Sequence, residues 1–297
     1  MKRITVFTPT YNRGYIIENL YKSLKRQDFV DFEWIVVDDG STDNTKALFE
    51  KILEDDKNFS VIYECKENGG KHRAINRGLQ LASGELFFIV DSDDYLTDDA
   101  LRLVDDMEKS IPESEKRKSF AGVCALKGYS ETELIGTTFS GDILDITILE
   151  RTKYGIEGDK AEVFYTDILR KYPFPEFEGE NFLTECIVWD RMAYDGFKLR
   201  FFNKICYIAN YLEDGLSAKY HKLMDNNPKS KGLYLYQCGL YGKLFGLKKW
   251  NEYYKYYQDY RDKFKFGEIA KNLHINPVVL FFRFLGMKIF YKLYDAK

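Results

Sequence analysis

The chain has 297 residues, of which 45% are hydrophobic and 31% are charged, and its formal net charge is −3. This length accommodates one large α/β domain or one domain with an appendage, and the 6 prolines and 21 glycines argue against extensive disorder. The charge is uneven: residues 263–297 hold seven Lys or Arg and two acidic residues, a net of +5, which leaves −8 for the preceding 262 residues. Such an acidic body argues against a nucleic-acid-binding protein.

The cysteines and the N-terminus indicate the compartment. The five cysteines are scattered, form no CxxC pair and mostly lie in apolar runs, which is typical of reduced core thiols in a cytoplasmic protein. The first three residues lead directly into a short strand pattern, so we expect no signal peptide. No segment reaches the ~20 apolar residues that span a bilayer.

The first hundred residues alternate between strand and helix patterns. The predicted strands lie at 3–8, 33–37, 61–63 and 86–90, and the predicted helices lie near 14–27, 43–56, 72–83 and 98–110. Such alternation predicts βαβ units with right-handed crossovers. The expected fold is therefore α/β, with a Rossmann-like, mostly parallel central sheet flanked by helices.

The pattern changes beyond Pro112. A further strand is predicted at 120–126, residues 128–160 have no clear period, and helical patterns return at 161–171 and near 181–195. A strand pattern at 199–209 follows. From about residue 219 onward the chain is rich in Tyr and Lys with helical spacing, which predicts a helical C-terminal extension.

Three acidic residues, Asp91, Asp93 and Asp94, directly follow the apolar run Leu86–Val90. Carboxylates this close repel one another and raise each other's pKa unless a cation neutralises them. Oxygen ligands suit Mg²⁺ or Mn²⁺, and such an ion could hold a diphosphate. The alternative is a solvated turn, since Asp is common in turns.

Two other predicted strands also end in polar or aromatic residues. Asp38 and Asp39 follow the strand at 33–37, and Tyr11 follows the strand at 3–8. In an open α/β sheet, ligands bind beyond the carboxyl ends of the strands. That edge would offer a ring for stacking, carboxylates for ribose hydroxyls or a base N–H, and carboxylates for a metal.

Four motifs occur here in a fixed order. They are TPTYN from residue 8, VVDDGSTDNT from residue 36, ENGGKHRAINRGLQLASGELFF from residue 67 and IVDSDD from residue 89. Over roughly residues 3–217 the chain resembles the family 2 glycosyltransferases with the GT-A fold. The resemblance implies an inverting transferase that uses a nucleotide-diphospho-sugar, preferably a UDP-sugar, with Mn²⁺ or Mg²⁺.

The resemblance also implies a domain organisation. Residues 1–217 would form the GT-A domain, with 1–110 binding the nucleotide-sugar and 111–217 binding the acceptor. Residues 218–297 would form the helical extension.

The resemblance assigns donor-binding roles in the first two motifs. Tyr11 is the candidate ring for stacking on uracil, and Thr8 and Pro9 would offer backbone groups to the base. Asp39 would accept a hydrogen bond from the base or a ribose hydroxyl, or Asp38 would do so instead, unless Asp38 only caps the following turn. The alternative for Tyr11 is an ordinary half-buried Tyr at a strand end.

The Gly-rich loop before the predicted third helix is a candidate phosphate site. Backbone amides at a helix N-terminus favour phosphate, so Gly70 and Lys71 are the candidate contacts. A flexible basic turn fits the residues of this loop equally well, and the resemblance favours the nucleotide contact.

Asp91 and Asp93 form the DxD pair that the resemblance implies. Asp93 is the expected direct metal ligand, and Asp91 would bind a ribose hydroxyl or a metal-bound water. Ser92, between them, is counted with the donor-binding residues. Asp94 would contact the sugar or the acceptor, or would only cap the next helix.

Inverting transfer needs a carboxylate that removes the proton of the acceptor hydroxyl. Related enzymes carry an acidic pair before an aromatic-x-Arg stretch, and here Thr184-Glu185 takes the place of that pair. Glu185 is therefore the candidate base and Glu180 its competitor. The structural alternative for Glu185 is a favourable charge in the first turn of a helix.

Two features remain open at the C-terminal side. His221 could reach the metal, although a surface histidine is the favoured interpretation. The apolar stretch 278–294 would pack on the catalytic domain or on a second subunit of a homo-oligomer, or would lie in the membrane interface. We favour peripheral membrane contact through 263–297, at the inner face of the membrane, which would suit a lipid-linked acceptor.

The expected function is thus transfer of a sugar to a saccharide or lipid-linked acceptor in the synthesis of cell-surface polysaccharide or glycan. One alternative is a nucleotidyltransferase that makes nucleotide-sugars, but Thr8–Arg13 lacks the Gly-rich loop such enzymes need. Another is a non-catalytic nucleotide- or sugar-binding protein, against which the intact acidic strand end and Glu185 argue. The sequence identifies neither the sugar nor the acceptor.

Overall fold

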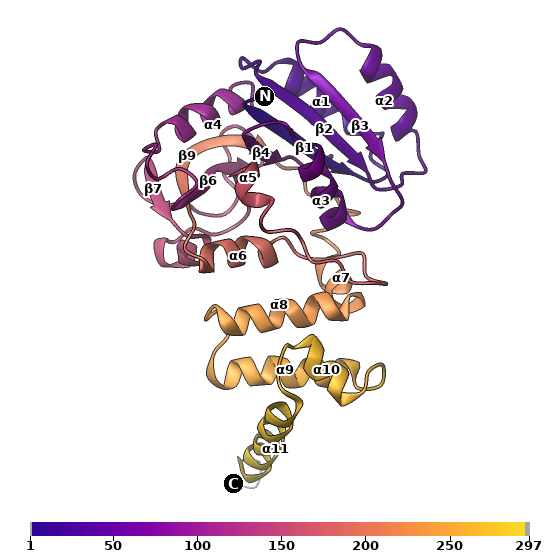
Figure 1. The fold of residues 1–297 in the computed structure, drawn as a ribbon, viewed down its shortest axis with the longest axis vertical. Helices are drawn as coiled ribbons and strands as arrows, with labels where there is room; N and C mark the ends of the chain where they lie inside the picture. The colour runs from indigo at the N-terminus through magenta and orange to yellow at the C-terminus, as the bar shows by residue number, and fades with distance from the viewer. Residues whose placement is uncertain (1, 295–297) are drawn as a thin grey trace. The chain divides into compact units, whose positions relative to one another are not determined.

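The computed structural model describes residues 2–294, and the side chains of residues 2–287 (Figure 1). The chain divides into two compact units. The first comprises Met1–Pro175 and Val188–Ala218, and the second comprises Glu176–Ile187 and Lys219–Lys297. The short segment 176–187 thus groups with the C-terminal helices, although the sequence places it within residues 1–217.

The first unit is built on a single mixed sheet. Its strands run in the order β3-β2-β1-β4-β8-β6-β9-β5, with β7 pairing β9. The strands are β1 (Ile4–Thr10), β2 (Phe32–Asp38), β3 (Ser60–Cys65), β4 (Leu86–Ile89), β5 (Tyr95–Leu96), β6 (Phe120–Gly128), β7 (Ile143–Ile146), β8 (Lys160–Tyr165) and β9 (Lys198–Ile208).

Helices connect and cover these strands. They are α1 (Glu18–Lys25), α2 (Thr45–Glu54), α3 (Lys71–Leu81), α4 (Ala100–Lys109), the 3₁₀ helix η1 (Ile148–Tyr154), α5 (Thr166–Leu169) and α6 (Cys186–Tyr194) (Figure 1). Helix α3 packs against β1 and β2, and α4 packs against β6 and β9. The predicted α/β fold with a helix-flanked central sheet is confirmed.

The four strands β3, β2, β1 and β4 are parallel neighbours. Every residue of β1 and β2 is buried, as expected for strands covered on both faces by helices. Thr10 of β1 is in register with Asp38 of β2, and Phe7 is in register with Ile89 of β4. The segments that follow these strands therefore emerge at the same edge of the sheet.

The predicted strands and helices of the first 110 residues are confirmed, with bounds that differ by a few residues. The helix predicted at 161–171 is wrong. Lys160–Tyr165 forms β8, which lies between β4 and β6 as their antiparallel neighbour, and only the four residues of α5 are helical. The alternation in KAEVFY suits a strand, and burial between two strands decides the outcome.

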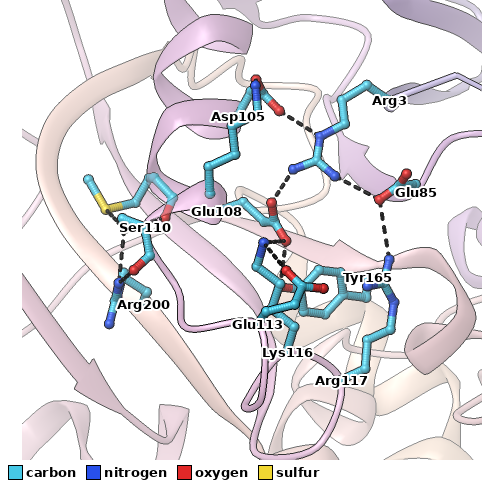
Figure 2. A network of polar contacts seen from close by, with 12 residues as sticks. Arg3, Glu85, Asp105, Glu108, Ser110, Glu113, Lys116, Arg117, Tyr165 and Arg200 are labelled. Carbon is cyan, nitrogen blue, oxygen red and sulfur yellow. Dashed lines mark hydrogen bonds and ion pairs between the residues drawn. The ribbon is translucent and has the colours of Figure 1, made fainter.

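A cluster of charges joins the start of β1 to α4 and β8 (Figure 2). Arg3 forms ion pairs with Glu85 at 2.7 Å, with Asp105 at 2.5 Å and with Glu108. Tyr165 donates a hydrogen bond of 2.7 Å to Glu108, whose side chain is only 1% exposed. Burial alone would raise the pKa of Glu108, but the hydrogen bonds from Tyr165 and Arg3 outweigh it and lower this pKa.

The Arg3 cluster predicts acid sensitivity. The pKa of Asp105 is also lowered, because hydrogen bonds from Lys109 and Arg3 outweigh the opposing effect of burial. Carboxylates with a depressed folded-state pKa stabilise the protein above their unfolded pKa of about 4, and this stability is lost as the pH falls through the folded pKa. We therefore expect the free energy of unfolding, measured with denaturant across a pH series, to decline below about pH 4.

Arg3→Met should lower the free energy of unfolding at neutral pH by about 1.5–3 kcal/mol, because it removes the guanidinium that bonds to the buried carboxylates of Asp105 and Glu108. Below pH 4, the free energy of unfolding of this variant should decline less steeply than that of the wild type. Arg102→Met is the matched control, since Arg102 lies on α4 and pairs with exposed Asp28, and exposed pairs contribute about 1 kcal/mol or less. An Arg3→Met variant with the wild-type slope would contradict the assignment.

The second unit is helical. Its helices are α7 (Tyr220–Asn226), α8 (Pro228–Leu240), α9 (Gly246–Tyr260), α10 (Phe266–Asn272) and α11 (Pro277–Tyr294). Its core joins residues of α8, α9, α10 and α11, among them Leu235, Tyr253, Tyr256, Ile269, Leu280 and Phe284. Within the described residues, no helix combines the length and the hydropathy that crossing a bilayer requires.

Candidate functional site

Hydrogen bonds hold the turns after β1 and β2 against each other. The amide of Asn12 donates to Ser41 Oγ at 2.8 Å, and Asn12 Oδ1 accepts from the amide of Thr42 at 2.8 Å. Asn12 has a positive φ of 53°, a conformation that Asn tolerates better than most residues. Tyr11 lies in this turn with 48% of its surface exposed, so its ring is accessible to a ligand.

The other two residues predicted to contact the base are buried in β1. Thr8 Oγ1 accepts a hydrogen bond of 2.9 Å from the Trp34 indole, and Pro9 is in register with Val37. The side chain of Thr8 therefore forms a hydrogen bond within the core. This arrangement agrees with the expectation that Thr8 and Pro9 would offer only backbone groups to a base. The contact with the base itself stays a prediction.

Asp39 ties the Gly-rich loop to the end of β2. Its side-chain oxygens accept from the amides of Gly69 at 2.9 Å and Gly70 at 2.7 Å, and Lys66 Nζ lies 2.5 Å from Oδ1. Gly70 has a φ of 97°, which favours glycine at this position. Here the Asp39 carboxylate and the Gly70 amide bind each other, and their predicted contacts with a nucleotide stay predictions.

The end of β4 brings together the predicted phosphate and metal residues. Lys71, the first residue of α3, places its Nζ 2.6 Å from Asp91 Oδ1. Arg13 places its Nε 3.9 Å from Asp93 Oδ2 and its Nη1 2.8 Å from Asp214 Oδ2. Three carboxylates and two cations thus meet where β1 and β4 end.

The two carboxylates of the DxD pair have opposite pKa shifts. Burial raises the pKa of Asp93, and the negative charge of Asp91 raises it further. For Asp91, burial acts in the same direction, but the charges of Lys71 and Lys127 outweigh it and lower the pKa. Ser92, between them, is buried. The electrostatics of this strand end are those of an acidic pair that a further cation would stabilise.

Asp94 faces strand β9. Its Oδ2 accepts from the Tyr207 hydroxyl at 2.6 Å and its Oδ1 from the Asn210 amide at 2.7 Å, while the Asp91 amide donates to the same Tyr207 oxygen at 2.9 Å. Burial raises the pKa of Asp94 to about 7, and the charge of Asp91 adds to this shift. Asp94 therefore links the DxD turn to β9, a role that the sequence does not indicate.

Three further residues at this edge escaped the sequence analysis. Arg13 immediately follows the TPTYN motif, and its proximity to an acidic motif about 80 residues later has no sequence signal. Lys127 of β6 places its Nζ 3.9 Å from the Tyr207 ring centroid. Lys127 and Tyr207 lie in strands without a recognisable motif, so only the folded sheet brings them to Asp91.

Asp91 and Asp93 have the chemistry of metal ligands. Among the residues that the structure describes, no group of three or more His, Cys, Asp and Glu side chains is arranged to hold one. However, Mg²⁺ commonly binds one or two carboxylates together with substrate phosphates and water. The repulsion that raises the pKa of Asp93 is the condition that a cation relieves. The pair therefore fits a divalent ion that a diphosphate helps to hold.

The two candidate bases lie in the second unit. Glu185 immediately precedes α6, in the segment 176–187. Glu180 is buried, and its carboxylate accepts from the amides of Lys229 at 2.6 Å and Ser230 at 2.9 Å. These amides belong to the first turn of α8, which has no partners of its own for them. Glu180 therefore acts as a cap for α8, and Glu185 remains the proposed base.

Glu180→Gln is expected to lower the free energy of unfolding by about 1–3 kcal/mol. The two backbone amides donate to different oxygens of Glu180, and in Gln one of these becomes an NH₂ group that cannot accept; Gln also carries no charge for the helix N-terminus. Denaturant unfolding would measure this loss. Glu178→Gln is the matched control, since Glu178 is exposed two residues away. Equal stability of the two variants would contradict the capping role.

His221 is exposed and lies edge-on to Tyr220, with ring centroids 5.7 Å apart. The described contacts of His221 thus give no support for a metal-binding role. They agree with the favoured interpretation of a surface histidine.

Comparison with known proteins shows which proteins this chain is similar to. Residues 5–110 match the model of the family described as Glycosyl transferase family 2. The chain is 30% identical over 184 residues to the GalNAc(5)-diNAcBac-PP-undecaprenol beta-1,3-glucosyltransferase of Campylobacter jejuni, covering 55% of this chain and 59% of that protein. It is 39% identical over 104 residues to the poly(ribitol-phosphate) beta-N-acetylglucosaminyltransferase TarS of Staphylococcus aureus, covering 34% and 18% of the respective chains.

Solved structures show the same fold. A crystal structure of S. aureus TarS 1–349 with UDP-GlcNAc aligns with a TM-score of 0.56 at 25% identity, covering 75% of this chain and 64% of that one. The mannosyltransferase PcManGT of Pyrobaculum calidifontis, in complex with GDP-Man and Mn²⁺, aligns with a TM-score of 0.52 at 21% identity, covering 78% and 63%. The chain thus spans less than two thirds of these proteins.

The fold and the acidic strand ends define an α/β protein of the GT-A class. Within that class, residues 5–110 match the Glycosyl transferase family 2 model, and the curated relatives above are glycosyltransferases. The resemblance seen in the four motifs is thereby confirmed.

Proposed function

We propose that the protein is an inverting, metal-dependent glycosyltransferase that moves a sugar from a nucleotide-diphospho-sugar, preferably a UDP-sugar, to a saccharide or lipid-linked acceptor. Residues 1–110 bind the donor and the remainder of residues 1–217 binds the acceptor. The observation that carries the proposal is the meeting of Asp91, Asp93, Lys71 and Arg13 where β1 and β4 end, beside the exposed ring of Tyr11.

The charges at this edge suit a diphosphate bound through a cation. Asp93 and Asp91 would hold Mn²⁺ or Mg²⁺, which when bound neutralises charge on the leaving diphosphate. Lys71 and Arg13 supply fixed positive charge within reach of the same carboxylates. The exposed ring of Tyr11 offers a stacking surface for the base. Asp39 ties the turn of Gly69 and Gly70 to the end of β2.

In the proposed reaction the acceptor oxygen attacks the anomeric carbon as the bond from that carbon to the diphosphate breaks. Glu185 takes the proton of the acceptor hydroxyl, and the nucleoside diphosphate leaves with the bonding electron pair. A single displacement of this kind inverts the configuration at the anomeric carbon. Glu180 is a poor base, because both of its oxygens serve the first turn of α8.

The relatives support a role in the synthesis of cell-surface polysaccharide or glycan. The Campylobacter relative is named for a polyprenyl-diphosphate-linked acceptor and the staphylococcal relative for poly(ribitol-phosphate). Transfer to a lipid-linked saccharide is therefore the preferred acceptor class for this chain. Such an acceptor would bring the enzyme to the inner face of the membrane.

Calorimetric titration with UDP, in the presence and absence of Mn²⁺, tests the donor site. We expect binding that strengthens when Mn²⁺ is present. A panel of nucleotide-sugars, assayed for release of the nucleoside diphosphate with and without saccharide acceptors, then tests catalysis.

The alternatives give different results in the same assays. A nucleotidyltransferase would release pyrophosphate from a nucleoside triphosphate and a sugar phosphate. A binding protein would bind the nucleotide-sugar and release nothing. Either result would overturn the proposal.

A further inference from the structure

Over Pro277–Met287, whose side chains the structure describes, helix α11 is apolar on two opposite sides. One side contributes buried residues to the core of the second unit, namely Leu280, Phe284 and Met287. The Phe284 ring meets those of Tyr254 at 5.1 Å and Tyr257 at 5.5 Å. The other side exposes large apolar side chains, with exposed fractions of 60% for Val278, 49% for Val279, 53% for Phe281, 63% for Phe282 and 43% for Leu285.

Helical geometry makes these exposed residues one continuous face. At about 100° per residue, positions 278, 281, 282 and 285 fall within about one third of the helix circumference, opposite Leu280 and Phe284. A surface helix of a water-soluble domain normally carries polar residues on that side. An exposed apolar face of this kind marks an interaction surface. We call Val278, Val279, Phe281, Phe282 and Leu285 the outer face of α11.

Positive charge flanks the outer face on both sides. Arg283 places its guanidinium 5.0 Å from the centroid of the Trp250 ring, on the α9 side. On the α10 side, Phe281 meets the Phe266 ring at 6.4 Å; exposed Lys265 directly precedes Phe266 in the chain, and exposed Lys263 lies three residues before it. The second unit, residues 176–187 and 219–297, holds sixteen Lys or Arg and ten acidic residues, a net of +6, against −9 for the rest of the chain.

We propose that the outer face of α11 docks onto an anionic phospholipid surface, with its aromatic and aliphatic side chains in the headgroup boundary and the flanking cations on the lipid phosphates. Aromatic and aliphatic groups between cations are the composition of helices that lie in the membrane interface. The proposal concerns the second unit only and does not rest on the transferase activity.

Charge favours a lipid surface over a second copy of this chain. In a symmetric dimer the same patch occurs on both partners, so the cations beside one outer face would meet the cations beside the other. Like charges placed together at an interface oppose association. An anionic bilayer instead complements the second unit's net charge of +6, and its phosphates can bind Arg283, Lys263 and Lys265.

The test uses exposed substitutions in the full chain. Deleting residues 263–297 would remove Ile269, Leu273 and Leu280 from the core of the second unit. A truncated chain that failed to bind vesicles could therefore have lost its fold and not only its docking surface. The variant Val278→Ser/Phe282→Ser removes apolar area from the outer face, and Lys263→Gln/Lys265→Gln removes two cations. The variant Val30→Ser/Leu53→Ser is the matched control, because both residues are exposed in the first unit.

Pelleting with vesicles of phosphatidylcholine, with and without phosphatidylglycerol, measures the docking. We expect the wild type and the control to bind the anionic vesicles and to be released by added salt. Loss of the two lysines should weaken binding by about fivefold for each cation. Loss of the two apolar side chains should weaken it roughly tenfold or more, with little sensitivity to salt.

Three outcomes would overturn the proposal. The wild type could ignore anionic vesicles at low salt. The outer-face variant could bind them as well as the control does. Size-exclusion chromatography could show a dimer that Val278→Ser/Phe282→Ser converts to a monomer, in which case a second copy covers the outer face.

Discussion

Replacing Glu185 by Gln is expected to lower kcat by about 10²–10⁴-fold, which is the usual contribution of a general base. The amide has the shape of the carboxylate but cannot accept the proton of the acceptor hydroxyl. Donor affinity should stay near the wild-type value, because the proposed donor contacts lie with Asp91, Asp93 and Lys71. Release of the nucleoside diphosphate at saturating donor and acceptor measures kcat, and calorimetry with UDP and Mn²⁺ measures affinity.

Glu180→Gln separates a base from a helix cap. If Glu180 caps α8, its variant should lose stability and keep most of its kcat at a temperature where it remains folded. Near-normal turnover in Glu185→Gln would refute the assignment of the base. A loss of kcat in Glu180→Gln with unchanged stability would transfer the role of base to Glu180.

Asp93→Asn is expected to remove the part of UDP affinity that depends on Mn²⁺. Outer-shell partners of a metal contribute about 10–100-fold to its affinity, so loss of a direct carboxylate ligand should cost at least about 100-fold. The fold should survive, because Asn is nearly isosteric and Asp93 occupies a strand-end turn rather than the apolar core. Titration of UDP at several Mn²⁺ concentrations measures the change.

Asp98→Asn serves as the control for the loss of one negative charge. Asp98 is exposed, pairs with Arg26 and lies only five residues from Asp93. It should bind UDP and Mn²⁺ as the wild type does. If Asp93→Asn also binds UDP and Mn²⁺ normally, the metal assignment fails.

The parallel half of the sheet is predictable because each of its elements has a local signal. Strands β1, β2 and β4 are short apolar runs covered on both faces, and amphipathic helices separate them. Strand β8 is different. Its six residues fit the start of a helix as well as they fit a strand, and only its neighbours β4 and β6 decide between them.

The candidate site divides in the same way. The carboxylates at the ends of β2 and β4 are visible as motifs, and the structure places them at one edge. Their partners are not visible, because Arg13, Lys127 and Tyr207 reach Asp91, Asp93 and Asp94 only through strand order. The sequence also cannot show that Asp39 binds the amides of Gly69 and Gly70.

The bonds of Asp39 and Lys71 change how ligand entry at this edge should be understood. Asp39 binds the loop amides of Gly69 and Gly70, and Lys71 binds Asp91, so these groups are already engaged. For the proposed enzyme, a nucleotide that contacts these groups arrives by exchange, breaking one set of polar contacts to form another. The affinity of the nucleotide is then the small difference between the free energy of the contacts it forms and that of the contacts it breaks. Specificity follows from that difference. A molecule that offers fewer hydrogen-bond acceptors than the carboxylates it displaces would leave amides of the loop without hydrogen bonds.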